Sequence, residues 1–134
     1  MILIKHSLSI STAVPVQIAA LAALTGPPKS LVERMTIWEE RRAYLYDTLA
    51  KLNLPVVRTP GAFYALIDIT SSGLTSAAFS SQFAEEEGIR VTPGHVFGPA
   101  GDAYVRVSFM TPRPDLDAAL EKLGRFWSRV GGQA

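Results

Sequence analysis

The chain has 134 residues, of which 48% are hydrophobic and 19% are charged. This length and composition predict one globular domain and exclude a disordered tail. A net charge of +1 gives no electrostatic case for nucleic acid or an anionic membrane as a partner. Because cysteine is absent and His6 and His95 are the only histidines, disulfides, cysteine nucleophiles and most metal sites are excluded. No run approaches the roughly 20 apolar residues of a membrane span, so we expect a cytoplasmic protein.

The N-terminal half predicts two helices. Residues 1–14, apolar with interleaved serines, are expected to form an extended or irregular lead-in. Pro15 suits the first turn of a helix, which Gly26 and the two prolines after it end. A longer amphipathic helix is expected over about 28–52, because apolar side chains recur at intervals near three and four residues. These side chains are Leu31, Met35, Trp38, Leu45, Leu49 and Leu52.

The C-terminal half predicts three short strands and two helices. Strands are expected over residues 63–69, 89–92 and 103–109, which are rich in branched and aromatic residues. One helix, capped by Thr75 or Ser76, runs to Glu87, and a final helix covers about 114–130. The element order indicates an α+β fold, with a small mixed or antiparallel sheet packed against helices in a single domain over residues 1–134.

Arg106 is the first candidate for a ligand-binding residue. Alternation in the strand 104–109 places Arg106 on one face with Tyr104 and Ser108, away from the valines on the other. Burying an arginine there is unfavourable unless it meets a carboxylate, which its planar fork matches in a two-bond geometry. The alternative is an arginine that faces solvent or pairs with an internal acid such as Asp68. The pattern alone favours that alternative by about two to one.

Other polar features give no catalytic candidate. The loop 94–101 contains three glycines but lacks the spacing of a P-loop, so a plain loop is favoured by roughly four to one or more over a phosphate site. His95 in this loop is expected to be polar surface. The run 85–87 of three glutamates points in different directions on a helix and is expected to be a solvated face. None of the lysines has an apolar, pocket-like setting that would suit Schiff-base chemistry. They are Lys5, Lys29, Lys51 and Lys122.

Five segments of the chain, in order and spacing, resemble one family. The segments are Gln17–Leu24, Glu40-Arg41-Arg42, Pro60-Gly61-Ala62-Phe63-Tyr64, Gly88–Gly98 and Tyr104–Phe109. They resemble the Gln-x-Ala-Ala helix, the Glu-Arg-Arg helix, the Pro-x-Gly-Ala-Phe-Tyr turn, the Pro-Gly-x-x-Phe-Gly segment and the Val-Arg-Ile-Ser strand of the class I/II aminotransferases that use pyridoxal phosphate, of aspartate aminotransferase type. The resemblance covers nearly the whole chain.

The resemblance implies that the chain is the C-terminal part of such an enzyme, chiefly its small domain. The family's carboxylate-binding arginine maps onto Arg106, which reverses the odds given by the pattern alone. By weaker analogy, Phe97 borders the substrate pocket. The family's cofactor-bonding lysine, and the groups that hold the pyridine nitrogen and the phosphate, belong to the large domain. We therefore expect pyridoxal phosphate in the parent enzyme, with amino acid and 2-oxo acid as substrates, and none bound to this chain.

Two consequences and two alternatives follow from this resemblance. Apolar surface that faces the rest of the parent enzyme is expected to be exposed and to favour self-association, and the isolated chain is expected to be inactive. The alternatives are a non-enzymatic α+β module that binds a small carboxylate or a protein partner through the Arg106 face, and a purely structural interaction domain. Because Arg106 reads only the carboxylate common to all amino acids, the sequence does not select one amino acid substrate.

Overall fold

The computed structural model describes residues 11–131, so most of the expected lead-in, residues 1–14, lies outside the described residues. The chain divides into two compact units, Met1–Arg34 and Met35–Ala134. Among the described residues, every helix is too short or too polar to span a membrane.

The described part of the first unit is helical and exposed. Helix α2 (Val14–Thr25) has proline in its first turn, and the amide of Gly26 closes it by donating to the carbonyl of Ala22. None of its residues is buried, although five are large and apolar. These are Val14, Val16, Ile18, Leu21 and Leu24.

The long helix α3 (Lys29–Lys51) starts in the first unit and continues into the second. Its predicted apolar stripe is only partly buried. Leu45 and Leu49 lie in the core, whereas Leu31 and Met35 are 57% and 54% exposed. The helix forms as predicted, but the apolar face of its first half is exposed, because periodicity identifies an apolar face without showing that anything covers it.

The second unit is an α+β arrangement, as predicted. Its other elements are β1 (Val56–Val57), β2 (Tyr64–Asp68), η1 (Thr70–Ser72), α4 (Ser76–Glu87), β3 (Thr92–Pro93), η2 (Gly94–Phe97), η3 (Pro99–Ala103), β4 (Tyr104–Ser108) and α5 (Arg113–Val130). Helix α4 begins and ends where its sequence indicates. The Thr75 side chain accepts a hydrogen bond from the amide of Ala78, and Gly88 adopts the left-handed conformation that ends the helix.

The sheet has four strands in the order β1-β2-β4-β3, and every pairing is antiparallel. The sequence predicted about three strands. It missed β1, which is only two residues long, too short to show a period. The strand expected over 89–92 is confined to Thr92–Pro93, because Ile89 and Val91 pack against the core without joining the ladder.

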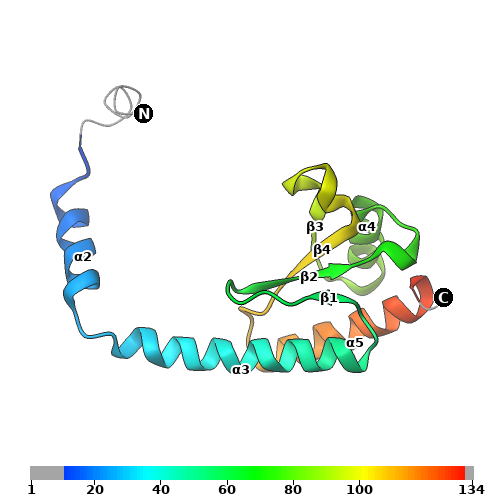
Figure 1. Cartoon of the computed structure of the whole chain (residues 1–134), viewed down its shortest axis with the longest axis horizontal. Helices are drawn as coiled ribbons and strands as arrows, with labels where there is room; N and C mark the ends of the chain where they lie inside the picture. Colours follow the sequence, from blue (N-terminus) through cyan, green and yellow to red (C-terminus); the bar gives the residue numbers. More distant parts are fainter. Residues whose placement is uncertain (1–10, 132–134) are drawn as a thin grey trace. The chain divides into compact units, whose positions relative to one another are not determined.

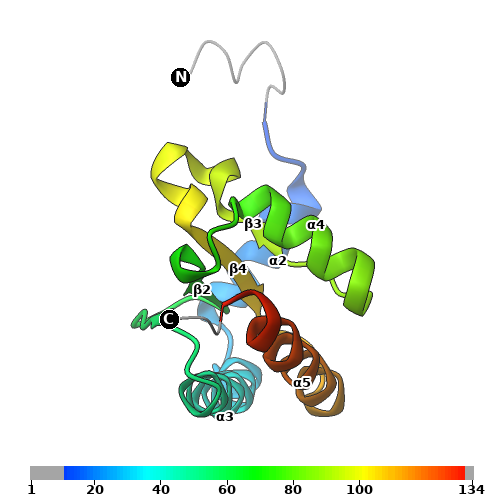
Figure 2. The ribbon, with the colours of Figure 1, turned by 90° about the vertical axis from the view of Figure 1, so that its right-hand side faces the viewer.

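One face of the sheet packs against the helices. Ala65, Ile67 and Val105 are fully buried on this face, and α5 runs beside the second half of α3 (Figures 1 and 2). Between α4 and α5, aromatic rings from both helices fill the space. The ring centre of Phe126 in α5 lies 5.0 Å from that of Phe79 in α4, and the two rings meet edge to face. The opposite face carries the alternate positions of β2 and β4, which are half-buried except for the exposed Ser108.

Ion pairs also join α4 to α5, which corrects one expectation. The carboxylate of Glu87 is within 3.2 Å of Arg125, and its side chain is only 10% exposed. Glu86 pairs with Arg129. The glutamate run is thus not a wholly solvated face. Among residues 11–131, no three or more His, Cys, Asp or Glu side chains gather in a cluster that could hold a metal ion.

Candidate functional site

Arg106 lies in the middle of β4, on the face of the sheet that the helices leave uncovered. Its register partners are Leu66 in β2 and Thr92 in β3. Tyr64 is the diagonal neighbour across the β2–β4 pair, and diagonal neighbours are within reach of long side chains. The Arg106 Cζ atom lies 5.1 Å from the centre of the Tyr64 ring. Arg106 therefore lies on the face opposite to that of buried Val105, as the alternation in the sequence predicted.

Phe97, the second predicted site residue, contacts the same guanidinium. The Arg106 Cζ atom lies 5.3 Å from the centre of the Phe97 ring, which comes from η2. Both distances are within the range of a cation–π interaction. A hydrogen bond from Nη2 of Arg106 to Oγ1 of Thr92, at 3.2 Å, fixes the other side of the group. Two aromatic rings and one hydroxyl therefore orient a guanidinium that has donors to spare.

Within residues 11–131, no carboxylate forms an ion pair with Arg106. Asp68, the acid suggested by the sequence, accepts a hydrogen bond from the amide of Thr70 at 2.9 Å instead. The interpretation of Arg106 as paired with Asp68 is therefore wrong. A half-buried arginine without a carboxylate partner favours an external anion, because its charge and its planar donor fork are otherwise left largely unused.

A pocket of about 170 Å³ adjoins the guanidinium. Its lining residues are Tyr64, Leu66, Gly94, Phe97, Gly101, Tyr104 and Arg106. Apart from Arg106 the walls are aromatic, aliphatic or glycine. A small carboxylate in this pocket would meet a cation in partly apolar surroundings, where electrostatic attraction is stronger than in bulk water.

The loop that carries Phe97 folds into two short helical turns, η2 and η3, in place of the plain loop that was expected. Gly94 and Gly101 touch, since a Cβ atom added to Gly94 would collide with the carbonyl oxygens of Gly101 and Tyr104. Both glycines therefore permit a close backbone approach that brings the ends of the loop together beside Arg106. This is a packing role, and no anion cradle is needed to explain them.

A hydrogen-bond network ties the loop to α4. The hydroxyl of Ser76 lies 2.6 Å from Oδ1 of Asp102 and 3.0 Å from Nδ1 of His95. Hydrogen bonds from the Ser76 hydroxyl and amide lower the pKa of the Asp102 carboxyl below its ordinary value, so this carboxylate remains charged at neutral pH. The sequence predicted that His95 is simply polar surface. The residue is exposed, but its ring also contacts the buried Ser76.

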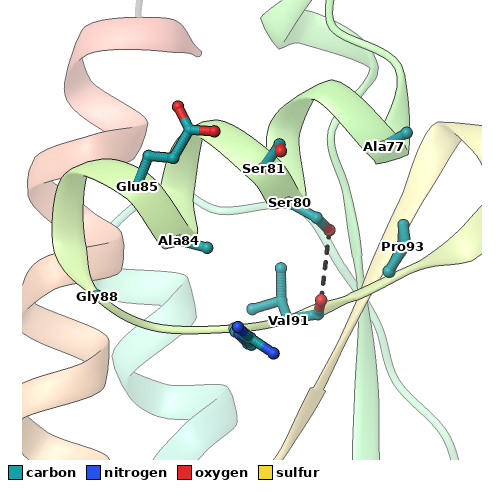
Figure 3. A pocket seen from close by; sticks show the side chains of 9 residues that line it. Ala77, Ser80, Ser81, Ala84, Glu85, Gly88, Val91 and Pro93 are labelled. Atoms are coloured by element: carbon teal, nitrogen blue, oxygen red, sulfur yellow. Dashed lines mark hydrogen bonds between the residues drawn. The ribbon is translucent and has the colours of Figure 1, made fainter.

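A wider hollow lies elsewhere, between α4 and the segment before β3 (Figure 3). Its volume is about 670 Å³, and small side chains such as Ala77 and Ala84 make up much of its lining. The Ser80 hydroxyl in it donates to the carbonyl of Val91 at 3.4 Å (Figure 3). It holds no arginine oriented by aromatic rings. The smaller pocket at Arg106 therefore has the more specific chemistry.

Comparison with known proteins defines the class: residues 2–123 match the family model for aminotransferase class I and II. The chain belongs to this family, and the resemblance seen in the sequence is confirmed. The probable N-acetyl-LL-diaminopimelate aminotransferase of Bacillus subtilis is 38% identical over 127 residues, which are 93% of this chain and 32% of that protein. The aspartate aminotransferase of Pyrococcus abyssi is 36% identical over 110 residues, 81% of this chain and 28% of that protein.

Solved structures agree with this assignment. The substrate-bound structure of BacF from Bacillus subtilis matches 96% of this chain and 33% of that chain, with a TM-score of 0.85 and 27% identity. The aromatic aminotransferase from Pyrococcus horikoshii matches with a TM-score of 0.72 and 36% identity, over 75% of this chain and 27% of that chain. The chain thus spans about a third of these proteins, and the α+β fold is that of the matching part.

Pyridoxal phosphate is the cofactor of this family, but the described residues around Arg106 do not fit it. The family binds the cofactor through a lysine amine, and no lysine lines the pocket. Lys122 donates to the backbone carbonyl of Glu87 at 2.7 Å, while Lys29 and Lys51 belong to α3. The described residues therefore place no lysine amine beside Arg106 to bond the cofactor.

Sequence reasoning missed several residues of the site. Tyr64 was noted only as part of a motif, yet its position in β2 alternates with buried Ala65, and that alternation could have placed it on the open face. Thr92 was expected in a strand, but its pairing with Arg106 depends on the sheet order. The contact between Ser76 and Asp102 joins residues 26 apart, and no sequence pattern announces it.

Proposed function

We propose that the chain is the C-terminal, small-domain part of a pyridoxal-phosphate-dependent aminotransferase, which transfers an amino group between an amino acid and a 2-oxo acid. Within that enzyme Arg106 binds the α-carboxylate of the substrate, and Phe97 borders the pocket. The observation that carries this proposal is the guanidinium of Arg106, which contacts Tyr64 and Phe97 and has no carboxylate partner among the described residues. A cytoplasmic location is compatible with the absence of cysteine.

Binding the carboxylate orients the substrate. Two parallel hydrogen bonds from a guanidinium to a carboxylate fix the plane of the carboxylate as well as its position. The Tyr64 and Phe97 rings and the Thr92 hydroxyl limit the rotation of Arg106, so little side-chain freedom is lost on binding. This chain therefore contributes positioning, while the cofactor supplies the electron-sink chemistry. We expect the isolated chain to show no turnover of amino acids with 2-oxoglutarate.

Ligand-induced stabilisation tests the proposal. A charge-assisted pair of hydrogen bonds worth about 3 kcal/mol corresponds to a Kd of roughly 6 mM for pyruvate. At about 100 mM pyruvate the chain should gain roughly 1.7 kcal/mol and melt about 5 °C higher. Pyruvamide with sodium chloride at matched ionic strength is the control, since it lacks the carboxylate. Equal melting temperatures in pyruvate and in this control would contradict the proposal.

The chain is also proposed to self-associate through α2. No residue of α2 is buried, and its large apolar side chains are exposed. Exposed apolar patches on soluble proteins mark interaction surfaces. We expect light scattering after size-exclusion chromatography to give a mass above 14.5 kDa, which falls toward the monomer value in Leu21→Glu. Gln17→Glu adds the same charge at a polar position of α2 and serves as the control. A monomer at all concentrations would refute self-association.

A further inference from the structure

We infer that Ser76 is a positioning residue for Arg106: with Asp102 and His95 it anchors the loop that holds the Phe97 ring against the guanidinium. The inference rests on the proposed function insofar as it concerns substrate. That the contact between Phe97 and Arg106 depends on the buried Ser76 hydroxyl is argued from the hydrogen bonds of this chain alone. Ser76 does not itself touch the pocket.

Ser76 is fully buried and lies at the start of α4. Its amide donates to Oδ1 of Asp102 at 3.0 Å, and its hydroxyl lies 2.6 Å from the same oxygen. An ionised carboxylate only accepts hydrogen bonds. The single hydroxyl proton of Ser76 is therefore directed at Asp102, and the hydroxyl oxygen keeps its lone pairs for other donors.

His95 supplies both of those donors. Its backbone amide donates to the Ser76 oxygen at 3.2 Å, and its ring Nδ1 lies 3.0 Å from that oxygen. Since the Ser76 proton is already committed to Asp102, Nδ1 must donate. This assigns the neutral His95 ring to the tautomer that carries its proton on Nδ1.

The same three residue types occur in hydrolase triads, but their connection here is different. In a triad the histidine accepts the serine proton. In this network the serine lies between the other two residues and gives its proton to the aspartate, and its oxygen is buried. The geometry therefore excludes Ser76 as a nucleophile activated by His95 and leaves it a structural role.

The network reaches Arg106 through the loop. His95 and Phe97 belong to the same short helical turn, η2, and Asp102 belongs to η3. One buried side chain thus anchors both turns to α4, whose Phe79 and Phe83 are part of the core. Phe97 itself is 60% exposed, so core packing does not hold its ring in place. Its position beside Arg106 depends on the loop, and the loop depends on Ser76.

Nuclear magnetic resonance on the whole 134-residue chain tests this inference. In the wild type at neutral pH we expect the nitrogen shifts of His95 to show the proton on Nδ1, and a nuclear Overhauser effect between Phe97 ring protons and the Arg106 side chain. Ser76→Ala should abolish that effect while the amide shifts of β2 and β4 stay in place. Its affinity for pyruvate should fall about two- to fivefold, the value of one cation–π contact. Ser81→Ala, at an exposed position of the same helix, should change neither.

The outcomes separate the two proposals. A proton on Nε2 alone in the wild type, or an unchanged Phe97–Arg106 effect in Ser76→Ala, would overturn the positioning role. If Ser76→Ala fails to fold, Asp102→Ala takes its place, because it removes the partner that accepts the hydroxyl proton. An unchanged Phe97–Arg106 effect in Asp102→Ala, or a proton on Nε2 alone in the wild type, would then overturn the positioning role. Absence of pyruvate binding to a wild type that shows the expected tautomer and contact would overturn the carboxylate function alone.

Discussion

Replacing Phe126 by alanine is expected to lower the free energy of unfolding by about 3–5 kcal/mol, the cost of removing a fully buried aromatic ring. Phe126 is completely buried, and its ring centre lies 5.0 Å from that of Phe79 and 5.2 Å from that of Phe83. The substitution therefore leaves a cavity between α4 and α5 that rigid neighbours cannot readily fill. Since domains are stable by only about 5–15 kcal/mol, this loss is a large fraction of the total free energy of unfolding.

Urea unfolding followed by far-ultraviolet circular dichroism measures this change. Phe97→Ala is the matched control, because it removes the same side chain from a position that is 60% exposed and should change stability by less than about 1 kcal/mol. Phe126→Leu, which keeps most of the volume, should fall between the two. Similar losses in Phe126→Ala and Phe97→Ala would show that the ring cluster between α4 and α5 is not the centre of the core.

Replacing Arg106 by glutamine is expected to weaken pyruvate binding at least about tenfold and up to roughly 150-fold, equivalent to about 1.5–3 kcal/mol for hydrogen bonds to a charged group. Glutamine keeps a polar side chain of related length but loses the charge and the paired donors. Arg106→Lys, which keeps the charge without the planar fork, should lie between glutamine and the wild type.

The control for this series is Arg90→Gln. Arg90 is exposed and lines the wider hollow beside α4, not the pocket at Arg106. Both glutamine variants lower the net charge by one, so a general electrostatic effect would weaken binding equally in each. Isothermal titration calorimetry with pyruvate measures the difference. Equal affinities for Arg106→Gln and Arg90→Gln would show that carboxylates are not bound at β4.

The helices and the face of β4 were predictable because their signals are local. Thr75 and Gly88 cap α4 as their residue types suggest. Alternation alone placed Arg106 and the buried Val105 on opposite faces of the sheet. The burial of Leu45 but not of Leu31 was not predictable, since a helix face is apolar whether or not a partner covers it. The contact between Arg106 and Tyr64 joins residues 42 positions apart through the β2–β4 register, and short strands do not reveal their register from sequence.

The site combines one residue that sequence identified with neighbours that only the fold supplies. The resemblance to aminotransferases selected Arg106 and Phe97 from a single chain, and the structure places them in contact. Thr92 joins them because β3 pairs with β4, although that strand is two residues long. Ser76 joins them through the η2–η3 loop, whose path depends on the close approach of Gly94 and Gly101. Such contacts arise from tertiary packing and leave no periodic trace.

The most direct measurement is a pyruvate titration of the ¹⁵N-labelled chain, observed at the guanidinium nitrogens of Arg106. A carboxylate held by the planar fork should shift the Nε and Nη resonances of Arg106 in a saturable manner, with a Kd of roughly 6 mM, while those of Arg90 stay in place. Pyruvamide should shift neither set. Resonances of Arg106 that do not move, or that move no more than those of Arg90, would contradict the assignment of Arg106 as the carboxylate-binding residue.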